Sequence, residues 1–307
     1  MNEDLPDPEL VRRVEVLLGG HGGSTSWAWS RARGGYTNAG RWRVRFADGG
    51  SVFVKAATGE DTAGWLRAEH RMYAHLGPRP FLPALLGWDG GGEAAAFPIL
   101  VLEDLGAAHW PPPWDDRRVR AVLDALVMVR ATLPFAPPEL PSLEAMRGDF
   151  ACWRDVAGAP EPFLALGLCT PRWLDEALPT LIAAEDAARL DGDDLLHRDV
   201  RSDNLCFRPE SGAALLVDWN WACRGNGRLD ITGWLPSLHA EGGPLPETVL
   251  PDEPELATLL AGFWASRAGK PDPRPGSRVR QVQRQQLRVA LPWASRALGL
   301  PPLGFTR

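Results

Sequence analysis

The first hundred residues alternate between strand-like and helix-like patterns of apolar positions. Two segments with alternating apolar and polar side chains flank Asp48-Gly49-Gly50, which is typical of a β-hairpin. We therefore predict a small, mainly antiparallel sheet with one or two helices up to residue 105. The expected elements, in chain order, are a helix over 8–18, strands over 42–46 and 51–56, a helix over 61–76, and strands over 84–88 and 97–102.

After Leu105 the pattern changes. Residues 106–114 contain three consecutive prolines and are typical of a linker. Helical spacing then dominates and predicts helices near 115–132, 171–190, 252–268 and 277–298, with two short apolar runs at 195–196 and 214–217. The chain is therefore expected to be an α+β protein of two lobes, with a sheet-bearing lobe over 1–105 and a larger, mainly helical lobe over 106–307.

Composition narrows the class of protein. The 307 residues are 45% hydrophobic and 23% charged, as in ordinary globular proteins. No apolar run reaches the roughly 18 residues of a membrane helix, and the acidic N-terminus does not resemble a secretory signal. A net charge of −6 argues against a dedicated nucleic-acid binder. The four cysteines form no CxxC pair, which favours reduced thiols and a cytoplasmic location over zinc or disulfides. A monomer or a dimer would fit.

The segment from His197 to Asn204 follows a short apolar run and matches the pattern H-R-D-x-x-x-x-N, which is typical of kinase catalytic loops. Asp199 could accept a hydrogen bond from a substrate hydroxyl and orient it for attack on phosphorus. Asn204 offers a neutral oxygen ligand to Mg²⁺. Taken alone, the pattern is equally typical of a surface turn with a local side-chain cap.

A second apolar run ends in Asp218. We expect this run and the run before His197 to be hairpin-linked strands, which would place Asp218 beside the first loop. Asp218 could then bridge a metal ion and nucleotide phosphates. A simple cap at a strand end is the alternative.

Lys55 lies within the strand predicted over 51–56. Only Lys55 and Lys270 are lysines among the 33 Lys and Arg residues. Because the sequence otherwise uses arginine, we expect that Lys55 is retained for its compact ammonium group rather than for charge alone. A buried ammonium needs a partner. Glu69 shares a helical face with Trp65 and Met72, and we predict that it forms an inward ion pair with Lys55. The alternative is a solvated glutamate.

Residues 34–40 form a glycine-rich turn between the first strands. It is neither the G-x-G-x-x-G loop nor a Walker A motif. Backbone N–H groups near Thr37 and Asn38 could still approach phosphate oxygens closely. An ordinary hairpin loop has the same composition, so this is weak evidence for a nucleotide site.

The order of these features resembles the aminoglycoside phosphotransferase and choline kinase-like superfamily over most of residues 30–235. The run from Val217 to Ile231 is similar to the family's "DW…A…G…DLA" segment. The resemblance implies a bilobal, protein-kinase-like fold and ATP as co-substrate. It implies that Asp199 is the catalytic base, that Asn204 and Asp218 hold Mg²⁺, and that Lys55 contacts phosphates with Glu69 behind it.

The resemblance also implies that adenine binds to backbone near Glu103–Leu105 and that Asp230 anchors the catalytic loop. Two positions depart from the family pattern. Arg198 stands where the family usually has glycine, and Arg201 replaces its second histidine. In protein kinases a cation at the second position can touch the transferred phosphoryl group, so Arg201 is a further catalytic candidate.

The interval between Asp218 and Asp230 is too short for the activation segment of a protein kinase, and no Ala-Pro-Glu occurs in it. We therefore expect transfer to a hydroxyl of a small molecule: an aminoglycoside or other antibiotic, a sugar or an amino alcohol. The acidic residues over 241–255 could form part of a pocket for a polycation or a solvated loop. A catalytically silent nucleotide-binding module and a protein kinase are the rival interpretations.

Overall fold

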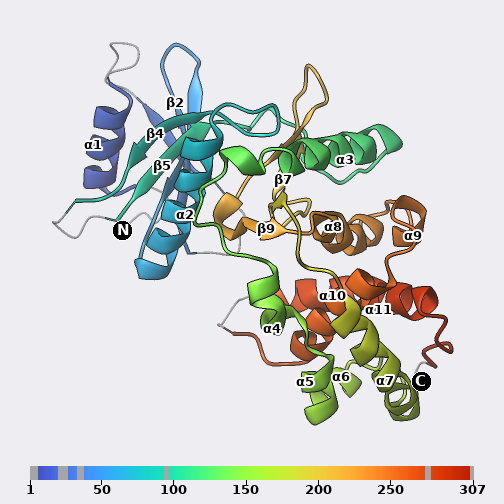
Figure 1. Cartoon of the computed structure of the whole chain (residues 1–307). Helices are drawn as coiled ribbons and strands as arrows, with labels where there is room; N and C mark the ends of the chain where they lie inside the picture. Colours follow the sequence, from blue (N-terminus) through green and yellow to red (C-terminus); the bar gives the residue numbers. More distant parts are fainter. Residues whose placement is uncertain (1–5, 20–26, 33–37, 93–96, 274–277, 305–307) are drawn as a thin grey trace. The chain divides into compact units, whose positions relative to one another are not determined.

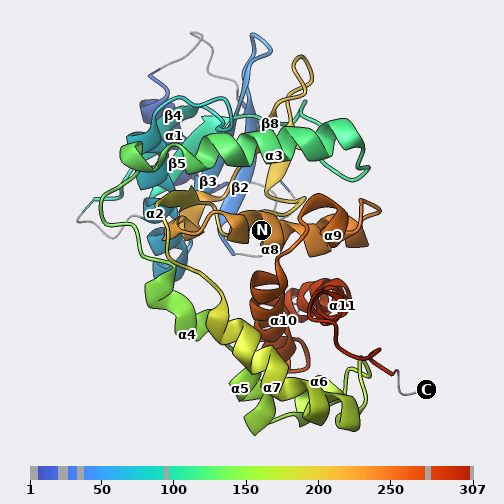
Figure 2. The ribbon, with the colours of Figure 1, turned by 45° about the vertical axis from the view of Figure 1, so that its right-hand side comes forward.

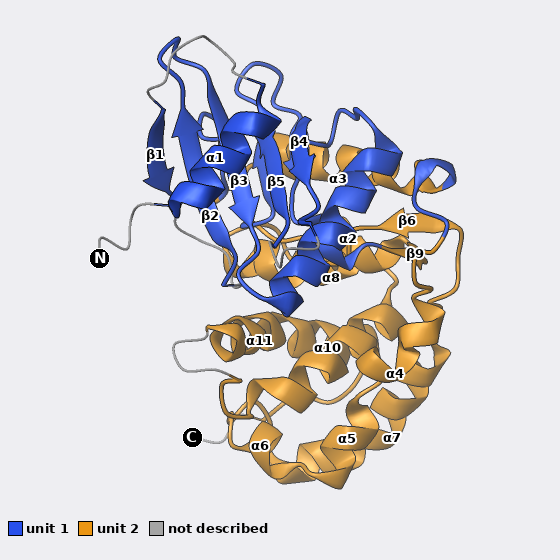
Figure 3. Cartoon of the chain, turned by 90° about the vertical axis from the view of Figure 1, so that its left-hand side faces the viewer, with its two compact units in different colours: residues 1–111, 134–138, 203–222 blue, residues 112–133, 139–202, 223–307 orange. Residues whose placement is uncertain are grey.

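The computed structural model describes residues 6–19, 27–32, 38–92, 97–273 and 278–304. The chain divides into two compact units, which Figure 3 shows in different colours. Unit 1 comprises residues 1–111, 134–138 and 203–222, and unit 2 comprises residues 112–133, 139–202 and 223–307. Unit 1 is therefore assembled from three separate stretches of the sequence.

Unit 1 is built on a five-stranded sheet with the strand order β1-β2-β3-β5-β4, and all of its neighbouring strands are antiparallel. Figure 1 shows the sheet with helices α1 and α2 beside it. The elements are α1 (Pro8–Leu17), β1 (Ala28–Arg31), β2 (Gly40–Arg45), β3 (Ser51–Ala56), α2 (Glu60–Leu76), β4 (Leu85–Asp89) and β5 (Ile99–Glu103).

The two faces of this sheet have different chemistry. Val44 pairs with Val52 and Val54 pairs with Val101, so their side chains share one face, which packs with Val14 of α1 into a buried apolar core. The opposite face carries polar residues of β2 and β3, because successive side chains of a strand point to opposite sides. Lys55 lies on this second face.

A hairpin from the middle of the sequence completes unit 1. It consists of β7 (Leu205–Phe207) and β8 (Ala214–Leu216) and is followed by the short turn η3 (Trp219–Trp221). Leu216 donates its N–H to the Phe81 carbonyl at 2.8 Å, and Trp219 packs on the Phe81 ring.

The pairing predicted between the two apolar runs is wrong. The run after Asn204 forms a strand of its own, β7, and β8 pairs with it. The earlier run forms β6 (Asp194–Leu196), which pairs with β9 (Cys223–Gly225) in unit 2. Hydrophobic runs identify strands but do not identify their partners.

Unit 2 is mainly helical. Helix α10 contacts α11, α7 and α5 (Figure 2). It is buried on nearly every side. The helices are α3 (Asp116–Arg130), α4 (Arg147–Phe150), α5 (Trp153–Gly158), α6 (Glu161–Leu164), α7 (Pro171–Ala187), α8 (Arg228–Ala240), α9 (Pro246–Val249), α10 (Pro254–Ala268) and α11 (Val279–Ala297), with the 3-10 turn η2 (Glu144–Met146). A further 3-10 turn, η1 (Leu133–Phe135), has its first residue in unit 2 and the others in unit 1.

Local signals fix several of these helix ends. The Asp115 side chain accepts the Arg118 N–H at 2.8 Å where α3 begins, and Thr170 accepts the Trp173 N–H at 3.1 Å where α7 begins. Pro171 occupies the first position of α7, where its missing N–H costs nothing. In the part of the chain that the structure describes, no helix combines the length and apolar character needed to cross a membrane.

Candidate active site

The Lys55 side chain is buried between two carboxylates. Its Nζ lies 2.9 and 3.0 Å from the two carboxylate oxygens of Glu69, and it also contacts Oδ1 of Asp218. The side chains of Lys55 and Glu69 are only 6% and 3% exposed, whereas that of Asp218 is 30% exposed. The ion pair predicted from the helical face of Glu69 is therefore present, and the Asp218 carboxylate joins it.

Electrostatics keep this lysine charged. Burial opposes the charged form, but the carboxylates of Asp218 and Glu69 outweigh it and raise the pKa of Lys55. Burial also raises the pKa of Glu69, and Lys55 and Arg41 hold it down in part. An ammonium with two anionic partners, one of them reaching solvent, can position anionic groups of a ligand.

Arg41 is a second cation of this region that the sequence reasoning missed. In the β2–β3 ladder it lies directly opposite Lys55, so both side chains are on the same face of the sheet. The positive charge of Arg41 lowers the pKa of Glu69 in part. The sequence does contain the information needed to find Arg41. The Asp48–Gly50 turn fixes the register of the hairpin, and the same register pairs position 41 with position 55.

Helix α2 places Glu69 at the sheet. Glu69 lies on the buried side of α2 with Leu66, Met72 and Tyr73. The helix also contacts η3, and the Trp65 and Trp221 rings lie 6.3 Å apart. The buried side of α2 therefore supplies the carboxylate that faces Lys55.

Asn204 and Asp218 lie at the two open ends of the β7–β8 hairpin. Val217 donates its N–H to the Asn204 carbonyl at 2.9 Å, which holds the ends together. Asn204 is buried, and Asp218 adopts a left-handed backbone conformation with φ 64°.

A carboxylate and an amide oxygen suit Mg²⁺, which takes few protein ligands and completes its shell with water and phosphate oxygens. The described residues contain no cluster of three His, Cys, Asp or Glu side chains able to hold a metal by themselves. Asp218 and Asn204 supply one carboxylate and one amide oxygen, which are donor types that Mg²⁺ accepts.

The catalytic-loop candidates belong to unit 2. The Asp230 carboxylate of α8 accepts the N–H groups of His197 and Arg198 at 2.7 and 2.8 Å, as the resemblance implied. Burial raises the pKa of Asp230, and His197 and the backbone donors lower it in part. Arg201 Nη1 lies 3.3 Å from the Asp199 carboxylate, so these two candidates form an ion pair.

A further contact of this loop had no signal in the sequence. Ser202 donates to Glu241 at 2.6 Å, and the Trp114 indole donates to the other Glu241 oxygen at 2.8 Å. Trp114 also packs edge-on against the buried Trp234, with ring centroids 5.5 Å apart. Glu241 therefore ties the loop to the end of α8 and to the start of α3.

The segment expected to bind adenine is held by ion pairs. Arg208 donates to Glu103 at 2.6 and 3.0 Å. Asp104 accepts from Arg43 Nε at 2.9 Å and from Ser51 at 2.7 Å. The Leu105 carbonyl accepts the Ala108 N–H and the Trp110 indole N–H. These contacts fix the backbone that follows β5.

Of the glycine-rich segment over 34–40, residues 38–40 are among the described residues. Thr37 lies outside the described residues. Asn38 is exposed, and its carbonyl accepts the Thr58 hydroxyl at 2.9 Å. The role predicted for Thr37 and Asn38 therefore stays a prediction.

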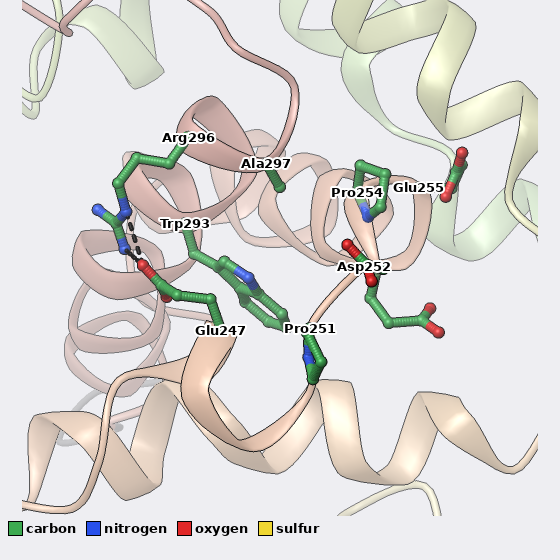
Figure 4. Close-up of a pocket in the computed structure, with 9 residues that line it drawn as sticks. Glu247, Pro251, Asp252, Pro254, Glu255, Trp293, Arg296 and Ala297 are labelled. Carbon is green, nitrogen blue, oxygen red and sulfur yellow. Dashed lines mark hydrogen bonds and ion pairs between the residues drawn. The ribbon is translucent and has the colours of Figure 1, made fainter.

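An acidic pocket of about 510 Å³ lies elsewhere in unit 2 (Figure 4). Three of its four carboxylates serve the fold. Glu247 pairs with Arg296, Glu253 pairs with Arg228, and Glu253 and Glu255 lie at the start of α10, where the helix dipole favours anions. Asp252 and the Trp293 ring also line it. No lining residue comes from the segment 197–204. The pocket is lined by residues 247, 251–255, 293, 296 and 297.

Comparisons with known proteins identify the family. Residues 28–232 match the phosphotransferase enzyme family, and the chain belongs to this family. No curated protein sequence matches the chain.

Three solved structures illustrate the similarity in fold. The GDP complex of aminoglycoside 2′-phosphotransferase-IIIa has a TM-score of 0.58 at 10% identity, covering 94% of this chain and 97% of that one. Spectinomycin phosphotransferase with ADP and spectinomycin has a TM-score of 0.56 at 13% identity, covering 96% and 99%. An aminoglycoside phosphotransferase from Alicyclobacillus acidocaldarius has a TM-score of 0.55 at 12% identity, covering 97% and 96%. The predicted bilobal, protein-kinase-like α+β fold is confirmed.

Proposed function

We propose that this protein is an Mg-ATP-dependent kinase that transfers the γ-phosphoryl group to a hydroxyl of a small molecule. The observation that carries the proposal is the buried Lys55 ammonium between Glu69 and Asp218. A fold gains little from burying a lysine with two carboxylates, because the desolvation of three charges offsets their attraction. A ligand that brings both negative phosphate groups and a positive metal ion would explain such a cluster, because it offers partners to the ammonium and to the carboxylates.

Each residue has a defined part in this proposal. Lys55 contacts the nucleotide phosphates, and Glu69 fixes the direction of its ammonium. Asp218 and Asn204 hold Mg²⁺, which neutralises charge on the phosphates when it is bound. Asp199 accepts a hydrogen bond from the acceptor hydroxyl, orients its oxygen toward phosphorus and takes its proton. Arg201, already paired with Asp199, is suited to the negative charge of the transferred group.

The acceptor is a small molecule in this proposal. Residues 219–227, between the proposed metal-binding aspartate and α8, contain only η3, β9 and three connecting residues, which leaves no length for a peptide-binding activation segment. Aminoglycosides and other antibiotics, sugars and amino alcohols are the candidate acceptors. Three of the solved relatives are named for antibiotic phosphotransfer, which supports testing antibiotics first.

The test is a screen for acceptor-stimulated ADP release with Mg-ATP and a panel of hydroxylated antibiotics, sugars and amino alcohols. The product is then identified by mass as the acceptor plus one phosphoryl group. The Asp199→Asn variant is the control, since it keeps the side-chain shape and loses the base. Nucleotide binding without turnover across the panel favours the silent-module alternative, and phosphorylation of a generic peptide favours a protein kinase.

A further inference from the structure

Arg198 has a backbone conformation that suits glycine. Its φ is 69°, in the left-handed region where a Cβ is close to the following carbonyl oxygen. Among the described non-glycine residues, only Asp218 and Asp252 share a positive φ. Aspartate tolerates this region because its short side chain can bond its own backbone, and arginine has no such compensation.

The backbone strain has a clear origin. Asp230 accepts the N–H groups of both His197 and Arg198, and two consecutive donors turned to one carboxylate set the peptide orientation. This explains the φ value of residue 198. It does not explain why the residue is arginine, since glycine would make the same backbone bonds at lower steric cost.

The side chain of Arg198 supplies the missing explanation. Its Nη1 lies 3.0 Å from the Met146 sulfur, and its guanidinium carbon lies 5.3 Å from the centre of the Phe150 ring. It also reaches the buried Cys223 thiol: burial raises the pKa of that thiol to about 12, and Arg198 lowers it in part. Three residues from two separate segments therefore surround one guanidinium.

Met146 and Phe150 belong to a segment, residues 144–150, that is itself anchored. Arg147 forms a bidentate pair with Glu144 at 2.7 and 2.8 Å and donates to the Ala188 carbonyl at 2.7 Å. The segment is thereby tied to the end of α7. Because the Arg198 side chain contacts this anchored segment, the segment restrains the backbone of the residue that precedes Asp199.

We propose that Arg198 is a positioning residue: its side chain clamps the catalytic loop to residues 144–150 and so fixes Asp199 for its reaction. The proposal rests on the proposed function, because it needs Asp199 to orient an acceptor. Strained backbone conformations are concentrated at functional sites, where surrounding contacts compensate for their cost, and Arg198 fits this description.

Replacement of Arg198 by glycine distinguishes a positioning role from the alternative that arginine is merely tolerated at this position. Arg198→Gly relieves the steric cost and removes the clamp, so the Tm is expected to stay the same or rise while kcat falls about 10- to 100-fold. The KM for ATP should stay within about twofold, because the nucleotide residues are untouched. Phe150→Leu should lower kcat in the same direction and add little in the Arg198→Gly background, because both remove one contact.

Asp252→Gly is the matched control, since it also relieves a positive φ in unit 2 and lies outside the segment 197–204. Its kcat should equal that of the wild type. Unchanged kcat in Arg198→Gly, or a kcat loss that follows a fall in Tm, overturns the proposal.

Amide hydrogen exchange across residues 195–204 gives a second readout that needs no turnover. Faster exchange in Arg198→Gly than in the wild type and in Asp252→Gly supports the clamp, and equal exchange contradicts it. If the wild type proves inactive but the exchange difference appears, the clamp stands and the proposed kinase activity falls.

Discussion

Lys55 and Asp218 are in direct contact although 163 positions separate them in the sequence. One comes from a strand of the five-stranded sheet, and the other follows the β7–β8 hairpin. Each charge compensates the other in a site where Lys55 is almost fully buried. Removal of Asp218 would leave the buried Lys55 ammonium with one of its two carboxylate partners, and removal of Lys55 would leave the two carboxylates without the ammonium between them.

Lys55→Arg should lower kcat/KM for ATP at least about 100-fold, although it keeps the positive charge. A planar guanidinium cannot replace a compact ammonium held by two oxygens of Glu69 and one of Asp218. Lys270→Arg is the matched control, because it makes the same change at an exposed turn and should have no effect. Steady-state kinetics at varied ATP measure both. Normal ATP kinetics in Lys55→Arg would remove the lysine from the nucleotide site.

Asp199→Asn should lower kcat by about 10²–10⁴ with little change in the KM for ATP. The amide keeps the size of the side chain but cannot take the hydroxyl proton. Circular dichroism and thermal unfolding establish that the variant is folded, and single-turnover phosphoryl transfer measures the chemical step. Wild-type turnover in this variant would assign the base to another residue.

Arg41→Gln should weaken ATP binding about 10- to 100-fold, as expected for the loss of a charge-assisted contact. Arg41 shares the Lys55 face of the sheet. Arg45→Gln is the control on the same face of the same strand, opposite Ser51 and exposed. Calorimetric titration with ATP and with adenosine separates the phosphate effect. Equal losses for both ligands would exclude a phosphate contact.

Glu185 should make stability fall as the pH rises from about 4.5 to about 7. This buried carboxyl group accepts the N–H groups of Cys152 and Trp153, but burial outweighs them and raises its pKa to about 7. Between the unfolded and folded pKa values the folded state binds more protons, so its advantage is full below pH 4.5 and lost above pH 7. The upper limit is about 3 kcal/mol.

Urea unfolding at pH 5 and pH 7.5 measures this effect, and Glu185→Gln gives the comparison. The variant should show a smaller fall in unfolding free energy between the two pH values. The nearby charges of Arg154 and Asp186 also act on Glu185 but remain in both proteins, so they cancel in the difference. Identical pH slopes in the two proteins would exclude Glu185 as the titrating group.

Strong periodicity predicted many elements well. The helices expected over 8–18 and 61–76 form as α1 and α2 within one residue at each end. Helix α8 was missed because Leu229, Trp234, Leu235 and Leu238 bury it on several sides, so its sequence has no polar stripe at helical spacing. The strands β7 and β9 have three residues each, which is too short to show the alternation of apolar and polar side chains that identifies a strand.

The parts of the site that depend on local sequence motifs could be predicted. The Lys55–Glu69 pair follows from a lysine in a strand and a glutamate on an apolar helix face. The Glu241 contacts with Ser202 and Trp114 join three distant loops, and no local pattern encodes such a meeting. By its sequence the acidic run over 241–255 could form a pocket or a loop. In the structure residues 247 and 251–255 line a pocket, and Glu247 and Glu253 are paired there with arginines.

The division of unit 1 into three stretches affects how the protein is made. A ribosome releases the chain from its N-terminus, so the sheet emerges long before residues 203–222. Until then Lys55 has Glu69 but not Asp218, and the contact of α2 with η3 has not formed. The charges of the nascent sheet therefore remain incompletely neutralised while residues 112–133 and 139–202 of the other unit are synthesised. We expect the protein to depend most on chaperones during this interval.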